Sequence, residues 1–158
     1  MGNQAIFDRA MEQNQLAVRQ GDWGRALKEA LRAMQEVPNN TEARIAVATA
    51  LYHNEKLPQA LQLFTELQKA DPSNPIFMEY IARINQAQGD TDTAIDLFLQ
   101  LADRQAQLGI VMKAVRAYRE ILEFAPEHEE ARIRVAMILA QSGDKPGAIR
   151  EFVFLGHN

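Results

Sequence analysis

GDWGRALKEALRA (21–33) is the first of five related stretches that decide the fold. The other four are EKLPQALQLFTEL (55–67), GDTDTAIDLFLQL (89–101), GIVMKAVRAYREI (109–121) and GDKPGAIREFVFL (143–155). Each has an alanine five residues after its first position. These alanines are Ala26, Ala60, Ala94, Ala114 and Ala148. They follow one another at intervals of 34, 34, 20 and 34 residues. Self-similarity at a fixed period of this length is the signature of a repeat architecture.

The residues around each alanine have the periodicity of a helix. Ala60, for example, is followed by Phe64 and Leu67, and positions i, i+4 and i+7 share one helical face. Glycine at the front of most stretches accepts the positive φ found where a preceding helix ends. Proline, which cannot continue a helix, closes three of the units. These prolines are Pro38, Pro72 and Pro126. Each stretch is therefore predicted to be the second helix of a helix–turn–helix unit.

The first helices are predicted upstream of three of these stretches. They are TEARIAVATALYH (41–53), PIFMEYIARINQAQ (75–88) and EEARIRVAMILAQS (129–142). Thr41 and Pro75 are residue types suited to helix starts. No segment shows the strict alternation of a half-buried strand, so the predicted fold is all-α.

The early repeat at Ala114 predicts an unusual helix. The interval of 20 residues equals a 34-residue unit without one helix and its turn, which together take about fourteen residues. We therefore expect one long helix over about 91–108, shared by two units, with Leu101, Ala102 and Leu108 facing the helix that follows. A break at 103–106, giving two short helices, is the alternative. Because a single added helix inverts the chain direction, we also expect a kink, or two sub-blocks meeting, near 105–112.

A family resemblance rests on the repeated Gly-Asp, on the alanine expected where two helices cross (the crossing alanine), on the aromatic residue four positions later, and on the closing VPNN, DPSN and APEH. In these motifs the chain resembles the tetratricopeptide repeat family over nearly its whole length. The resemblance implies one right-handed helix–turn–helix solenoid domain, 1–158, of about nine helices. The expected units are 7–40, 41–74, 75–108, a shortened 109–128, and 129–158. Glu55 replaces the turn glycine in the second unit, and the first helix is unusually polar at Gln13 and Asn14.

Composition excludes several classes of function. The net charge of −4, with both signs mixed along the chain, supplies no basic surface for nucleic acid. Arg132 and Arg134 are expected on solvated helix faces. There is no cysteine, and no apolar run approaches the length of about 18 residues needed to span a membrane. The N-terminus has no leader pattern, so a cytoplasmic location is expected.

No catalytic, metal or cofactor motif is evident. The three histidines lack metal-ligand spacing, and no phosphate-binding glycine loop occurs. EHEE (127–130) is best explained as the acidic start of a helix, where the dipole favours negative charge. Trp23 is interpreted as a residue that packs a turn rather than one that stacks on a ligand. We therefore expect a protein that is not an enzyme and needs no cofactor.

The resemblance implies that the first helices line a groove that binds an extended or helical segment of a protein partner. Transferred by register, the groove residues are Met11, Gln15, Ile45, Thr49, Tyr52, Tyr80 and Arg83. One subset of the family holds chaperone tails with Lys and Asn, but the matching positions here are Met11, Gln15, Ala46, Ile76 and Tyr80. Chaperone-tail binding is therefore not expected.

The last helix suggests an alternative function. Solenoid ends need a polar cap, yet this helix carries the apolar run FVFL (152–155). Phe152, Phe154 and Leu155 are the expected terminal interface. The chain would then be an assembly module that forms a homo-oligomer, or a part of a longer repeat protein. Folding of this apolar side inward is the third interpretation.

Overall fold

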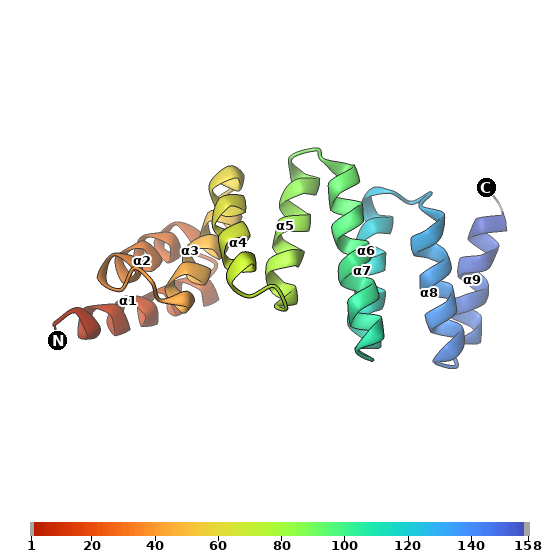
Figure 1. Cartoon of the computed structure of the whole chain (residues 1–158), viewed down its shortest axis with the longest axis horizontal. Helices are drawn as coiled ribbons and strands as arrows, with labels where there is room; N and C mark the ends of the chain where they lie inside the picture. Colours follow the sequence, from red (N-terminus) through yellow and green to blue (C-terminus); the bar gives the residue numbers. More distant parts are fainter. Residues whose placement is uncertain (1, 157–158) are drawn as a thin grey trace. The chain divides into compact units, whose positions relative to one another are not determined.

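The computed structural model describes residues 2–156, and these residues form nine helices in sequence (Figure 1). The helices are α1 (Gly2–Arg19), α2 (Trp23–Glu36), α3 (Thr41–His53), α4 (Leu57–Ala70), α5 (Pro75–Ala87), α6 (Thr91–Gln107), α7 (Val111–Phe124), α8 (Glu129–Gln141) and α9 (Lys145–Gly156). This all-α repeat fold confirms the fold class predicted from the sequence. The expected starts at Thr41 and Pro75 are also confirmed.

The corners that end α1, α3, α5, α6 and α8 share one backbone geometry. A residue with positive φ follows each of these helices, and four of the five are glycines. At Gly109, φ is +78°, and the next residue, Ile110, donates its N–H to the carbonyl of Gln105 at 2.8 Å. Glu55 takes the same place with φ +61°, and Lys56 donates to Leu51 at 2.9 Å. These 6→1 bonds satisfy carbonyls that a helix end leaves free.

The prediction of one long helix is confirmed by α6. It is continuous from Thr91 to Gln107, without the break considered at 103–106. Its first residues follow the Gly89 corner and its last residues lead into the Gly109 corner. Elsewhere the second helix of a unit ends at a proline-containing connection. The start of α6 therefore follows a glycine corner, as the second helix of a unit does. Its end leads into a glycine corner, as the first helix of a unit does.

The packing of α6 differs from the expectation at its last turn. Leu108, expected to face α7, is the C-cap residue and is 68% exposed. The side chain of Gln105 is buried in that turn instead. The Leu108 N–H still donates to the carbonyl of Arg104 at 3.1 Å, but Leu108 is the last residue before Gly109, where the chain turns into the corner. Its side chain therefore lies outside the apolar face formed by Leu101 and Ala102.

The described helices group into two compact units, residues 1–84 and 85–158, divided inside α5. In the first unit, α1 packs on α2, α2 on α3, and α3 on α4; in the second, α6 to α9 pack in the same sequential way. Residues 105–112, where the sequence suggested a kink or a boundary, lie inside the second unit. They form an ordinary corner there because α6 and α7 are held together by the Phe98 and Phe124 rings, 6.2 Å apart, and by a hydrogen bond from Tyr118 to Asp103.

The crossing alanines form the centre of both units. Four of the five are completely buried, and Ala148 is nearly so. A side chain of this size lets two helix backbones approach closely, which agrees with the sequence prediction. The polar residues of α1 also have partners: buried Asn14 donates to the carbonyl of Ala26 at 2.8 Å, and Gln13 accepts a hydrogen bond from Arg25.

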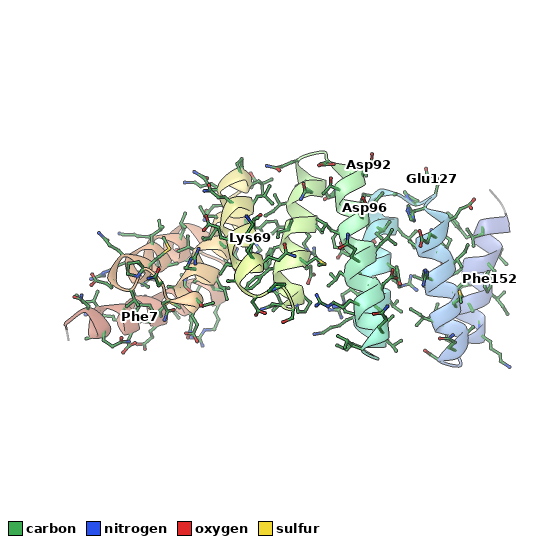
Figure 2. All side chains as sticks on the ribbon, viewed as in Figure 1. Phe7, Lys69, Asp92, Asp96, Glu127 and Phe152 are labelled. Atoms are coloured by element: carbon green, nitrogen blue, oxygen red, sulfur yellow. The ribbon has the colours of Figure 1, made fainter. Side chains whose placement is uncertain are left out.

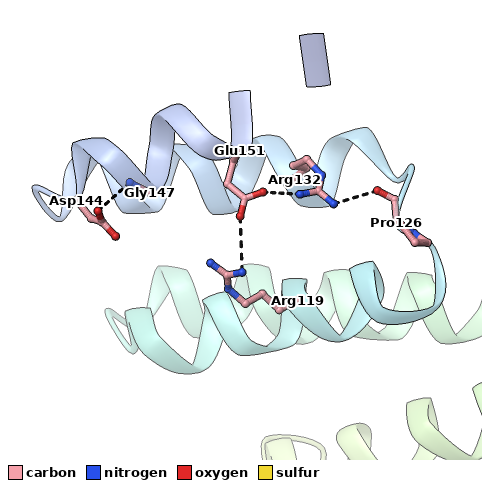
Figure 3. A network of polar contacts seen from close by, with 6 residues as sticks. All are labelled: Arg119, Pro126, Arg132, Asp144, Gly147 and Glu151. Atoms are coloured by element: carbon pink, nitrogen blue, oxygen red, sulfur yellow. Dashed lines mark hydrogen bonds and ion pairs between the residues drawn. The ribbon is translucent and has the colours of Figure 1, made fainter. Parts of the chain in front are cut away.

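A charged network fixes α9 in the second unit (Figure 3). Glu151, buried on α9, lies 2.6 Å from the Arg132 guanidinium of α8 and 3.6 Å from that of Arg119 on α7. Arg132 also donates to the carbonyl of Pro126 at 3.1 Å and covers the Phe154 ring at 3.5 Å. The expectation of a solvated Arg132 is therefore wrong, because a carboxylate nineteen residues later and an aromatic ring enclose it. Arg134 is about half exposed, as expected.

Candidate functional site

The candidate site lies in the first unit, between the C-terminal turns of α3 and the face of α5. Its pocket has a volume of about 370 Å³. The lining residues are Tyr52, His53, Ile76, Glu79, Tyr80 and Arg83. On α5 the lining residues recur at helical spacing, so one face of that helix forms one wall.

Stacked and edge-on rings build the α3 side of this pocket. Tyr52 meets Tyr80 edge-on at 5.2 Å and His53 edge-on at 5.1 Å. His53 in turn stacks on Trp23, with ring centroids 3.8 Å apart and planes at 11°. Tyr80 stacks on the buried ring of Phe64 at 4.5 Å. Aromatic pairs in these geometries add stability beyond area burial, so the ring contacts stabilise the pocket wall.

Polar side chains in and beside the pocket can form hydrogen bonds and ion pairs. Arg83 pairs with Glu79 one turn earlier on α5, at 2.9 Å. Burial raises the pKa of Tyr80, although a hydrogen bond between the Tyr80 and Thr49 side chains acts in the opposite direction. Burial lowers the pKa of His53, which favours the neutral imidazole. A neutral ring has one nitrogen that donates and one that accepts, so it suits backbone groups of a peptide.

The predicted groove residues separate into two groups. Tyr52, Tyr80 and Arg83 line the pocket, and Thr49 supports it through its bond to Tyr80. Ile45 is half-buried on α3, and Gln15 is exposed on α1. Met11 is also half-buried, and it packs against the cluster that includes Phe7 and Ala43, so part of its surface belongs to the core.

Three lining residues were not among the predicted groove residues: His53, Ile76 and Glu79, of which Ile76 had been named only as a position that matches the chaperone-tail clamp. Ile76 and Glu79 carry a usable signal, because they lie on the same helical face as Tyr80 and Arg83. His53 carries the same signal on α3, because it lies one turn after Thr49, and its ring also stacks on Trp23. That stacking, with the packing of Trp23 against the cluster around Ala26, confirms the interpretation of Trp23 as a packing residue.

The remaining candidates lie on α8 and α9. Phe152 is exposed, Phe154 is partly covered by Arg132, and Leu155 is half-buried. In the EHEE stretch, His128 is the N-cap of α8, and its Nδ1 accepts from the Ala131 N–H at 3.2 Å. Among residues 2–156, no three His, Asp or Glu side chains gather closely enough to hold a metal ion. Within the same range, none of the helices is both long and apolar enough to cross a membrane.

Known proteins with this helical repeat architecture were found by comparison of sequence and of structure. A tetratricopeptide repeat family model matches residues 12–75, 54–108 and 81–153. No curated protein matches the chain in sequence. The solved structure of MamA 41-end from Desulfovibrio magneticus RS-1 is 13% identical, with a TM-score of 0.56 over 96% of this chain and 94% of its own.

Two further solved structures share the fold. A tetratricopeptide repeat protein from Parabacteroides merdae is 21% identical, with a TM-score of 0.57 over 96% of this chain and 66% of its own. The TPR2B domain of yeast Sti1, solved in a complex with pHsp70, is 14% identical, with a TM-score of 0.65 over 78% of this chain and 99% of its own. The three overlapping matches of the family model reach from the middle of α1 into α9, and the chain belongs to the tetratricopeptide repeat family.

Proposed function

We propose that the chain is a non-catalytic scaffold that binds a segment of a partner protein in the groove between α3 and α5. Tetratricopeptide repeat proteins mediate protein–protein interactions. The observation that carries the proposal is the pocket itself, where Tyr52, Tyr80 and Arg83, chosen by register alone, converge. Tyr and Arg are enriched among the residues that dominate binding energy at interfaces.

The lining suggests what the groove accepts. Ile76 and the tyrosine rings offer an apolar surface for one large side chain of the partner. The Tyr hydroxyls and the neutral His53 offer hydrogen bonds to the polar backbone of the same segment. A volume of about 370 Å³ suits one or two side chains, and its open form suits a segment that continues past the pocket on both sides.

The test begins with peptides selected from a random twelve-residue display library on the full chain. Their affinities are then measured by fluorescence anisotropy for the parent, for Tyr52→Ala and for Tyr80→Phe, which keeps the ring that stacks on Phe64. We expect Tyr52→Ala to weaken the selected peptides at least about tenfold, and Tyr80→Phe to weaken them less. Met112→Ala, a change of an exposed α7 residue, is the matched control.

Selected peptides that bind Tyr52→Ala and the parent equally well would exclude this groove as the binding site. Circular dichroism of each variant separates loss of binding from loss of fold. Tyr52 is half-buried and at the end of α3, so its truncation leaves the crossing alanines and the buried Phe64 in place.

A further inference from the structure

The α9 helix presents an apolar face that nothing in the second unit covers. Ile149, Phe152 and Val153 are 59%, 49% and 51% exposed. Figure 2 labels Phe152 on this helix. The spacing of the three residues, i, i+3 and i+4, places them on one side of the helix. Single exposed apolar side chains are common, but three large ones on one helix face indicate an interaction surface.

Comparison by register shows that this exposure is particular to α9. Phe152 comes four residues after the crossing alanine Ala148. The residues in the same position of α4, α6 and α7 are Phe64, Phe98 and Tyr118, and each is at most 1% exposed. The same position therefore holds a large ring in four helices, and only in α9 does that ring reach solvent.

The helices that cover these rings show what kind of occupant fits. Tyr80 of α5 stacks on Phe64, and Phe77 of α5 lies 6.4 Å from the same ring. Phe124 of α7 lies 6.2 Å from Phe98. In both cases a helix covers the ring. The surface around Phe152 thus has the shape requirements of a helix-binding face, which an amphipathic helix meets with apolar residues at i, i+4 and i+7.

The orientation of this face is fixed from the opposite side of α9. Glu151 and Phe154 point toward Arg132 of α8, and at about 100° per residue they lie about 160° and 140° around the helix from Ile149. The ion pair and the cation–π contact therefore prevent α9 from rotating its apolar face inward. A preorganised surface loses less conformational entropy on binding, and affinity rises accordingly.

The charges on α9 indicate which kind of helix could bind to its apolar face. The exposed charged residues of α9 are Lys145 and Arg150, whereas its only carboxylate, Glu151, is buried against arginines. Pairing of two α9 helices from two copies would bring like charges together. Stacking on α1 of a second copy is also unfavourable, because α1 has Arg9, Gln13 and Leu16 where α5 has its apolar stripe Phe77, Ile81 and Ile84.

We propose that Ile149, Phe152 and Val153 of α9 form a second docking surface, which binds an amphipathic helix of a partner protein with an apolar stripe and acidic flanks. This surface lies on a different unit from the α3–α5 groove, and the inference goes beyond the proposed function. Lys145 lies one turn before Ile149 on the same face, and Arg150 lies three residues before Val153, at the edge of that face. Both are placed to attract glutamates that flank the stripe of the bound helix.

The experiment uses two labelled twenty-residue helical peptides with the same Phe, Val and Ile stripe, one flanked by Glu and the other by Lys. Fluorescence anisotropy measures both against the full chain. We expect the acidic peptide to bind at least about tenfold more tightly than the basic one. Phe152→Ser should weaken the acidic peptide at least about tenfold, whereas Met112→Ser, an exposed α7 control, should leave it unchanged.

Three results would overturn the proposal: no binding of the acidic peptide, equal binding of both peptides, or binding that survives Phe152→Ser. A fourth is a dimer of the parent chain, seen by light scattering and lost on Phe152→Ser, because the occupant would then be a second copy. Tyr52→Ala serves as the cross-check. It affects the groove alone, so failure of one site leaves the other assessable.

Discussion

Glu151→Ala tests whether the charged network of Figure 3 holds the last helix in place. The change removes the carboxylate and leaves Arg132, whose side chain is 13% exposed, without its charged partner. Breaking a buried ion pair in this way costs about 3–5 kcal/mol, because the remaining charge stays desolvated. The Arg119 contact contributes at most about 1 kcal/mol, since that side chain is half exposed. We therefore expect a loss of about 3 kcal/mol.

Hydrogen exchange of the α9 amides measures this loss where it occurs. In a repeat protein the terminal helix opens by itself, so a local destabilisation of about 3 kcal/mol raises the exchange rate of α9 on the order of a hundredfold. Amides of α1 to α4 should exchange at the parent rate. The control Arg119→Ala should raise α9 exchange less than about tenfold.

A double substitution separates the loss of one charge from the loss of the pair. Replacing Arg132 by Met together with Glu151 by Leu removes both charges and fills the space with apolar atoms, so α9 should exchange much more slowly than in Glu151→Ala alone. If Glu151→Ala and Arg119→Ala have the same small effect, the pair is solvated in solution. The argument that it fixes the orientation of α9 would then be wrong.

Three further predictions concern the corners and crossings. Glu55→Gly should raise the melting temperature by about 2–3 °C, because a non-glycine residue at φ +61° costs about 1 kcal/mol; Gly109→Ala, at φ +78°, should lower it, and a change in the same direction for both would contradict the reasoning. Ala60→Leu should destabilise by about 1–3 kcal/mol, as measured by denaturant unfolding, because the crossing at this buried position has no room for a larger side chain. Burial, and then the nearby Asp103, raise the pKa of Tyr118 above its ordinary value of about 10, so stability should be intact below pH 10 and fall above it as the unfolded chain ionises first. Tyr118→Phe should flatten that alkaline decline in thermal melts, and an unchanged decline would assign it to other groups.

The positions of helices and corners were predictable because their signals are local. A glycine at positive φ, a crossing alanine and a closing proline each act within a few residues of the chain. The 20-residue interval at Ala114 even predicted a continuous α6. Local signals also explain the error at Leu108, since helix periodicity extended past the corner counts a residue that the bend turns outward.

The site was only partly predictable because its geometry depends on contacts between distant residues. Arg132 looks like a surface residue in sequence, and only Glu151 and Phe154 of the next helix enclose it. The His53 ring stacks on Trp23, thirty residues earlier in the chain, and no local pattern predicts that pair. No periodicity encodes such pairs, whereas Tyr52 and Tyr80 followed from register because the same helical position recurs in each repeat.

Recurrence of equivalent positions also permits an inference that a single exposed residue would not. An exposed phenylalanine taken by itself needs no explanation, since folded proteins leave much apolar surface in contact with water. Phe152, however, can be compared with equivalent residues of the same chain. Phe64 and Phe98 also lie four residues after a crossing alanine, and a neighbouring helix covers each of them. An apolar ring kept at this position of α9 is therefore best explained by a helix that covers it.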